Sequence, residues 1–231
     1  PDLLAFVQLL GPDGSPLVIK EVMPADSFYP TSRWEKGEFV LGEIKFYVPG
    51  DVPSGRYPVI LGLLRADTRE IIPAGRRQYI IAGYVEVEGR EPRHSYEIPP
   101  VAAPEARFGD FALLRGAELE KGPDRITVTL YWEALGSSPE PCKIFLHLLG
   151  PDGRISAQVD AFPQGGLLPT TAWIRGERLM DRFELLLPPG LPPGRYKLIV
   201  GFYEPETGAR IPATTGGVEQ DHVTLGFVDL P

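Results

Sequence analysis

The sequence predicts an all-β protein made of two tandem antiparallel β-sandwich units, the first of which lacks strands at its N-terminal end. Three observations lead to this fold class. The chain of 231 residues contains 26 Gly and 26 Pro, and such frequent helix breakers suit short strands joined by tight turns. Apolar and polar residues alternate over strand-length segments. A long stretch of the sequence also occurs twice.

The duplicated stretch begins at a Phe-x-x-Leu-Leu-Gly-Pro-Asp-Gly segment, which occupies residues 6–14 and again residues 145–153. The spacing of 139 residues continues without a gap to residues 74 and 213, and 24 of the 69 aligned positions are identical. Chance similarity would not keep one spacing over 69 aligned positions. Both copies should therefore have the same fold.

Each copy should open with a β-hairpin. Apolar runs at residues 4–10 and 144–149 end in Gly-Pro-Asp-Gly, a turn sequence with Pro at its second position and Gly at its fourth. The returning arms should be residues 16–22 and 154–159. Asp13 of the first turn, like its counterpart Asp152, should stabilise the bend.

Three further strands are expected in each copy, which makes each an antiparallel, immunoglobulin-like sandwich. In the segment 195–203, every second residue from Tyr196 to Phe202 is apolar or aromatic, so these residues share one face. The expected strands are residues 38–48, 56–64 and 79–87 in the first copy and residues 177–187, 195–203 and 222–230 in the second.

The second copy has extra sequence at its front. Residues 111–120 and 125–134 look like two more strands, whereas only five residues precede Phe6. A sandwich without these strands would expose a sheet edge and one side of its core. Preceding sequence, another chain or the linker could supply them, and we favour preceding sequence. The expected domains are residues 1–90, a Pro-rich linker at 91–107 in which Ser95–Ile98 could pair briefly with a sheet, and residues 108–231.

The composition excludes several classes of function. The net charge is −8 and the pI is about 5.0, and without basic clusters the chain should bind neither nucleic acid nor anionic lipid. No apolar run approaches the roughly 18 residues of a membrane span, so we expect no membrane insertion within this segment. The single cysteine, Cys142, excludes an internal disulfide and a cysteine-based metal site.

No residue set suggests catalysis. The three histidines are His94, His147 and His222, and none lies in a zinc-binding or nucleophile-elbow motif. Cys142 follows a proline at the start of a strand, which favours a packed thiol over a nucleophile. We therefore expect a protein that is not an enzyme and that has no cofactor and no metal.

Two carboxylates of the second copy flank the loop 161–176. Asp160 and Asp181 could be a glycosidase acid and base, calcium ligands beside loop carbonyls, or caps that accept hydrogen bonds from loop amides. We favour capping. The first copy has Glu21 and Gly42 at these positions, so it retains at most one of the pair.

Aromatic residues give the clearest indication of binding. Trp34 and its counterpart Trp173 follow Pro-Thr in long loops, where an exposed indole could stack on a sugar ring. Alternatively, each Trp closes the end of its own sandwich, and we favour this structural role. Tyr57 and Tyr196, each after Gly-Arg at a strand start, resemble corner tyrosines that fasten a sandwich edge.

The second copy also carries a recognisable series of motifs. They are Phe145 to Arg154, Gln158-Val159-Asp160, Pro169-Thr170-Thr171-x-Trp173-x-x-Gly176-Glu177, Leu191 to Tyr196, Gly201-Phe202-Tyr203 and Thr207-Gly208-x-Arg210. This series resembles the extracytoplasmic C-terminal β-sandwich repeats of bacterial dolichyl-phosphate-mannose mannosyltransferase-like membrane proteins and of related uncharacterised envelope proteins. More distantly, it resembles the sugar-binding C-terminal domain of O-antigen ABC transporters. The first copy matches less well.

The resemblance implies a fragment of a larger membrane-anchored protein, placed in the cell envelope beside a catalytic membrane domain. We therefore expect a non-catalytic extracytoplasmic module that binds a glycan or a membrane-protein partner, with Trp173, Asp160, Asp181, Tyr203 and Arg210 as the candidate ligand-binding residues. One alternative is a spacer or assembly domain without a small ligand, which holds other domains at a distance or forms a dimer through its incomplete sheet edge. The other is a carbohydrate-active enzyme.

Overall fold

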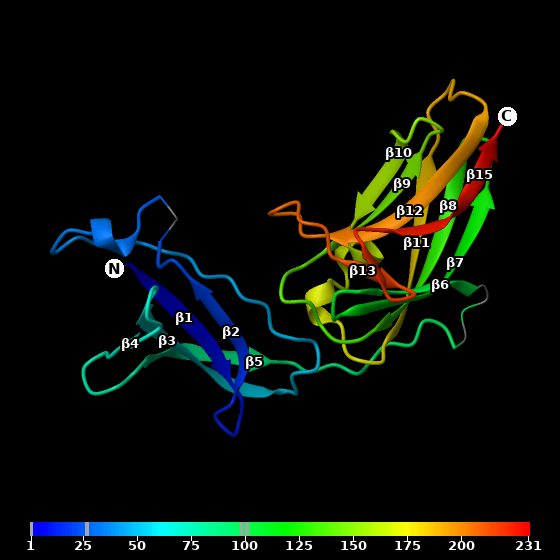
Figure 1. The fold of residues 1–231 in the computed structure, drawn as a ribbon. Helices are drawn as coiled ribbons and strands as arrows, with labels where there is room; N and C mark the ends of the chain where they lie inside the picture. Colours follow the sequence, from blue (N-terminus) through cyan, green and yellow to red (C-terminus); the bar gives the residue numbers. More distant parts are fainter. Residues whose placement is uncertain (1, 26–27, 98, 100–101) are drawn as a thin grey trace. The chain divides into compact units, whose positions relative to one another are not determined.

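A computed structural model describes residues 2–25, 28–97, 99 and 102–231, and the chain divides into two units between Arg90 and Glu91 (Figure 1). Antiparallel strands make up nearly all of the regular structure, so the predicted all-β class is confirmed. In the described part of the chain, no helix has the length and apolar character that crossing a membrane requires.

The elements follow the chain in the order drawn in Figure 1. The first unit contains β1 (Leu3–Leu10), β2 (Pro16–Val22), the 3-10 turn η1 (Thr31–Arg33), β3 (Gly55–Arg65), β4 (Ile71–Ile72) and β5 (Ile80–Val87). The second contains β6 (Ala102–Phe108), β7 (Ala112–Lys121), β8 (Arg125–Ala134), β9 (Lys143–Leu149), β10 (Ile155–Ala161), η2 (Pro163–Gly166), η3 (Thr170–Ala172), β11 (Arg178–Leu186), β12 (Gly194–Tyr203), β13 (Ala213–Thr215), β14 (Val218–Gln220) and β15 (Val223–Leu230).

The second unit is a complete two-sheet sandwich. Its sheets have the orders β10-β9-β12-β15 and β11-β8-β7-β6-β13-β14. Because successive side chains of a strand point to opposite faces, the inward-facing residues of both sheets form one core. At its centre, the rings of Phe108, Trp132 and Phe202 lie with centroids 5.0 to 5.7 Å apart.

The first unit has a single sheet within its described residues. Strands β2, β1, β3 and β5 lie side by side in that order, with the short β4 beside the end of β3. This order reproduces the sheet β10-β9-β12-β15 of the second unit. The predicted duplication is therefore visible as one sheet topology that occurs twice.

Hydrogen bonds at the sandwich corner also repeat. The Tyr57 hydroxyl donates to the carbonyl oxygen of Pro53 at 2.9 Å, and the Tyr196 hydroxyl donates to that of Pro192 at 2.7 Å. Each bond closes the loop that leads into β3 or β12. The predicted corner role of both tyrosines is confirmed.

The Gly-Pro-Asp-Gly turns are alike as well. Asp13 Oδ1 accepts a hydrogen bond from the Ser15 amide at 3.0 Å, and Asp152 Oδ1 accepts one from the Arg154 amide at 3.0 Å. Both aspartates stabilise their turn through the backbone two residues on, as predicted.

Residues 38–48 do not form the long strand that the sequence predicts. Their counterpart β11 pairs with β8 along its whole length, from Arg178 opposite Glu133 to Leu186 opposite Arg125. Among the described residues of the first unit, no strand takes the place of β8. A strand needs a neighbour for its ladder of hydrogen bonds, so this segment, which we call the strap, stays extended without becoming a strand.

The predicted linker at residues 91–107 is part of the second unit. The Ser95 amide donates to the Arg178 carbonyl oxygen at 2.7 Å, and the Arg178 amide donates to that of Arg93 at 3.0 Å. Residues 93–95 thus pair briefly with β11 of the second unit, whereas the expected pairing segment is Ser95–Ile98, of which Ile98 lies outside the described residues. The linker assignment is wrong for residues 102–107, because they pair with β7 as part of β6.

Candidate functional site

The five predicted ligand-binding residues fall into two groups. Trp173 and Asp181 are buried between the sheets of the second unit. Asp160, Tyr203 and Arg210 lie together on the outer face of the sheet β10-β9-β12-β15, since Phe145, their common neighbour, faces away from the core. The structure therefore brings together three of the five residues.

Trp173 is 0% exposed, so its indole cannot stack on a ligand. Its Nε1 donates to the Leu168 carbonyl oxygen at 3.2 Å, and its ring packs edge-on against Phe111 and Phe202. The prediction that Trp173 contacts a ligand is wrong in this structure. Its alternative, a Trp that closes the end of its own sandwich, is confirmed.

Asp181 faces the core because it alternates in phase with the buried Leu179 and Phe183. It is 4% exposed, and its Oδ1 accepts a hydrogen bond from the Gln164 amide at 2.5 Å. Gln164 has a φ of 49°, in the left-handed region that most residues avoid. Asp181 therefore caps a strained loop, as the favoured alternative predicts, and offers no surface to a ligand.

Burial raises the pKa of Asp181 to about 6, while the Gln164 amide and the Trp132 indole N–H act in the opposite direction. Asp181 Oδ2 and Trp132 Nε1 are both buried, and neither makes a hydrogen bond among the described residues. The Trp132 indole N–H is near enough to lower the pKa of the Asp181 carboxyl, but the two groups do not meet hydrogen-bond geometry. Asp181 points into the core from the six-stranded sheet, whereas Asp160 lies on the outer face of the four-stranded sheet. The two carboxylates therefore do not form an acid–base pair across a common cavity.

The outer-face cluster is built around Phe145. Its ring lies over Gly201, where a Cβ atom would come within 2.3 Å of the ring, so this position requires glycine. The Arg210 guanidinium covers the ring at 4.5 Å from its centroid, and Arg210 Nη1 pairs with Asp221 Oδ2 at 2.6 Å. This packing covers the Phe145 ring, which is only 1% exposed.

His147 lies beside this ring and is 8% exposed. Its Nε2 is 3.9 Å from Asp160 Oδ1, and its Nδ1 has no hydrogen-bond partner among the described residues. Burial lowers the pKa of His147, while Asp160 opposes and Arg210 reinforces this shift. Burial also raises the pKa of Tyr203, and the nearby Asp160 adds to the effect.

The only thiol of the chain, Cys142, is unsuited to nucleophilic attack. Its side chain is buried, and burial raises its pKa to about 11. The thiol is therefore protonated at neutral pH, whereas the thiolate is the reactive form.

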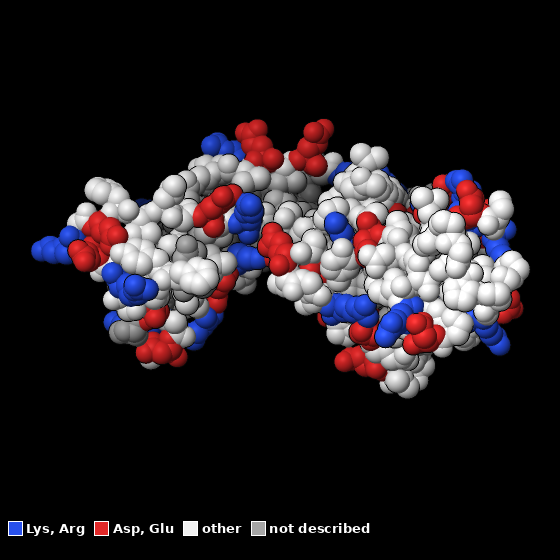
Figure 2. Space-filling model, turned by 90° about the horizontal axis from the view of Figure 1, so that it is seen from above, with Lys and Arg blue, Asp and Glu red and all other residues white. Residues whose placement is uncertain are grey.

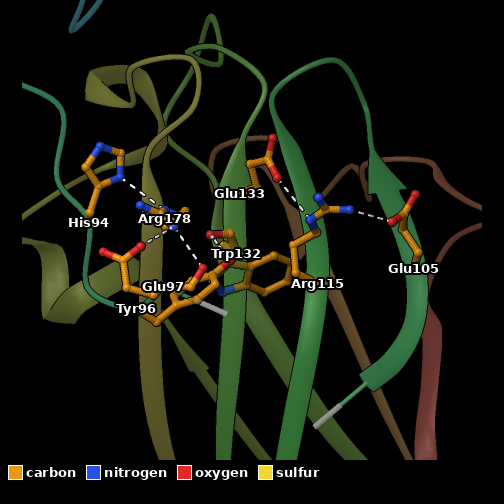
Figure 3. Close-up of polar contacts among 8 residues, drawn as sticks. All are labelled: His94, Tyr96, Glu97, Glu105, Arg115, Trp132, Glu133 and Arg178. Carbon is orange, nitrogen blue, oxygen red and sulfur yellow. Dashed lines mark hydrogen bonds and ion pairs between the residues drawn. The ribbon is translucent and has the colours of Figure 1, made fainter. Parts of the chain in front are cut away.

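A polar pocket of about 480 Å³ lies on the outer face of the six-stranded sheet and is lined in part by Tyr96, Glu97 and Pro99. Figure 3 shows Tyr96 and Glu97 beside Arg178. Arg115 pairs with Glu105 at 2.6 Å and with Glu133 at 3.0 Å, and Arg178 pairs with Glu97 at 3.0 Å. Each arginine in this pocket already has a carboxylate partner. The pocket therefore presents balanced charges rather than an unpaired charge for a ligand.

One face of the molecule shows a similar mixture of charges. On the face drawn in Figure 2, Lys and Arg side chains are interspersed with Asp and Glu side chains over both units. This face offers no extended field of one sign to attract a charged ligand.

An apolar groove of about 370 Å³ lies in the first unit, on the face of its sheet that corresponds to the core side of the second. The sequence predicts an exposed core here but not the shape of the groove. Its walls are aliphatic and come from the sheet, the strap and the segment around β4. They include Ala5, Ile44, Leu61, Leu63, Ile72 and Ile80.

Within the described ranges, no group of three or more His, Cys, Asp or Glu side chains could hold a metal ion. No protein-family model matches the chain, and no curated protein matches it.

Proposed function

We propose that this chain is a non-catalytic binding module whose first unit receives a protein partner. The observation that carries the proposal is the aliphatic groove on the uncovered face of the first sheet. Ile80, on its wall, is 47% exposed, and Leu61 beside it is only half-buried. Contiguous apolar surface of this kind marks interaction sites.

A protein fits this groove better than a glycan does. A sugar site needs an aromatic platform together with polar groups that bind hydroxyls. All the residues that line the groove have aliphatic side chains or none, and the predicted platform, Trp173, is buried. The groove therefore favours the protein-binding half of the expected function.

The proposal includes a place in the cell. The motifs around Asp160, Trp173 and Arg210 resemble those of extracytoplasmic repeats attached to membrane glycosyltransferases. We place the module outside the cytoplasmic membrane, where its partner belongs to the assembly around such an enzyme.

Two neighbouring residues of β5 allow a matched test. Ile80 pairs with Leu61 and lines the groove, whereas Ile81 pairs with Ile60 and points to the opposite face. The two side chains are almost equally exposed, at 47% and 49%. A photo-cross-linking amino acid at position 80 of the full-length protein in its own cells should give a discrete cross-linked polypeptide, and the same group at position 81 should not.

Mass spectrometry then identifies the cross-linked peptide. Ile80→Asp should prevent cross-linking from a neighbouring groove position, Ile72, because a carboxylate would be buried on binding. Ile81→Asp should leave it unchanged. Equal cross-linking from positions 80 and 81, or none from either, would favour a spacer without a partner.

A further inference from the structure

The second unit shows what covers the face that is open in the first. Leu63 of the groove corresponds in the repeat to Phe202. The Phe202 ring is surrounded by Phe111, Phe108 and Trp132, with centroids 5.2, 5.4 and 5.0 Å away. These three aromatic side chains fill the space that corresponds to the groove.

The covering residues come from one continuous segment. Phe108 ends β6, Phe111 lies in the turn after it, and Trp132 is on β8. The backbone takes part as well, since the Gly109 amide donates to the Pro212 carbonyl oxygen at 2.9 Å. The counterpart of Pro212 is Pro73, which lines the groove.

The groove also has the size and shape for aromatic side chains. Leu63 and Ala5 are smaller than their counterparts Phe202 and Ile144, which leaves more room in the first unit. The strap forms one wall through Ile44. At Gly42 the strap closely approaches the loop that follows β2, since a Cβ atom there would lie 1.7 Å from the Pro24 carbonyl oxygen.

Because the strap stands over the sheet, the face is a narrow groove rather than a flat surface. A second copy that packed sheet against sheet would have to displace the strap. A segment that inserts only its side chains into the groove could bind without displacing the strap. The geometry therefore favours insertion over a symmetric dimer.

We infer that the groove binds an antiparallel β-segment that carries aromatic side chains and belongs to the protein partner proposed above. This segment completes the first sandwich as β6 to β8 complete the second. The inference rests on the proposed function and names the kind of partner. On binding, the strap becomes a strand, because the segment supplies the neighbour that β8 provides for β11.

The test supplies such a segment artificially. Residues 102–135 are fused through a flexible linker to the N-terminus of the full chain, and amide hydrogen exchange of the strap is followed by mass spectrometry. The expected result is that exchange over residues 39–47 slows by about tenfold or more, because these amides enter a sheet ladder. The matched control carries Ala at Phe108, Phe111 and Trp132 of the fused copy only, and the strap should then exchange as in the unfused chain.

Unchanged exchange of the strap in the fusion would overturn the inference, and so would equal protection by the control segment. Self-association of the unfused chain that Ile80→Asp abolishes and Ile81→Asp preserves, measured by sedimentation, would also overturn it, because the occupant would be a second copy. If position 80 cross-links to a partner but the fused strands do not suppress that cross-link, the proposed function stands and the β-segment is wrong. If position 80 cross-links to nothing, the proposed function fails as well.

Discussion

The two units share one sheet and differ in what covers it. The corner hydrogen bonds of Tyr57 and Tyr196 are the same in both, and so are the Gly-Pro-Asp-Gly turns. Yet Trp173 is fully buried, while its counterpart Trp34 is only half-buried. The comparison indicates that hairpins and corners form from local sequence, whereas burial of the loop and the strap depends on a second sheet, which the described residues of the first unit do not form.

The largest expected difference concerns the paired tryptophans. Trp173→Ala should lower the free energy of unfolding of the second unit by about 3–5 kcal/mol, because it leaves a cavity among packed rings. Trp34→Ala should cost the first unit only about 1–2 kcal/mol, because less of its ring leaves water on folding. Urea denaturation, resolved for each unit by hydrogen-exchange mass spectrometry, measures both values. Equal losses would mean that the first unit is as well covered as the second.

The pH effect that arises from Asp181 should occur in the second unit alone, because the first unit has Gly42 at the corresponding position. The pKa of Asp181 rises from 3.8 to about 6 on folding, so its contribution to stability is fully present below pH 3.8 and is lost as the pH rises through about 6. The loss should be about 2–3 kcal/mol. Asp181→Asn should remove it, measured as the urea midpoint of each unit between pH 3.5 and pH 7.

The first unit has Gly42 at this position and supplies an internal control. The surface variant Asp110→Asn, whose carboxylate is 98% exposed, supplies another. A stability curve that keeps its slope in Asp181→Asn would show that this carboxyl is not the titrating group.

The smallest expected effect tests the likeness of the units. Tyr196→Phe and Tyr57→Phe each remove one hydroxyl that donates to a loop carbonyl. Each should lower the free energy of unfolding of its own unit by about 1 kcal/mol. Thermal denaturation of the two variants checks this, and a loss confined to Tyr196→Phe would show that the corner needs the second sheet.

The fold could be predicted largely from local pattern, and the main error has a clear cause. Residues 38–48 have the alternating apolar residues of a strand, since their inward positions carry Val40, Ile44, Phe46 and Val48. That pattern encodes a face to be buried but not the neighbour that completes the ladder. The neighbouring strand would come from another part of the sequence, so the pattern of residues 38–48 cannot reveal that it is missing.

The candidate site was predictable only in part. Asp160, Tyr203 and Arg210 do meet on one face, and this follows from strand pairing. The burial of Asp181 could have been found, because it alternates in phase with Leu179. The pocket at Arg115 and Arg178 had no local signal, since it depends on where Tyr96, Glu97 and Pro99 lie against the sheet.

The pairing of residues 93–95 with β11 has a consequence for solubility. β11 is the outermost strand of the six-stranded sheet, and an open strand of this kind invites uncontrolled growth of sheets from one molecule to the next. Arg93 and Ser95 occupy both backbone groups of Arg178 on that side. Residues 93–95 thus close the first residue of this edge to a strand from another molecule.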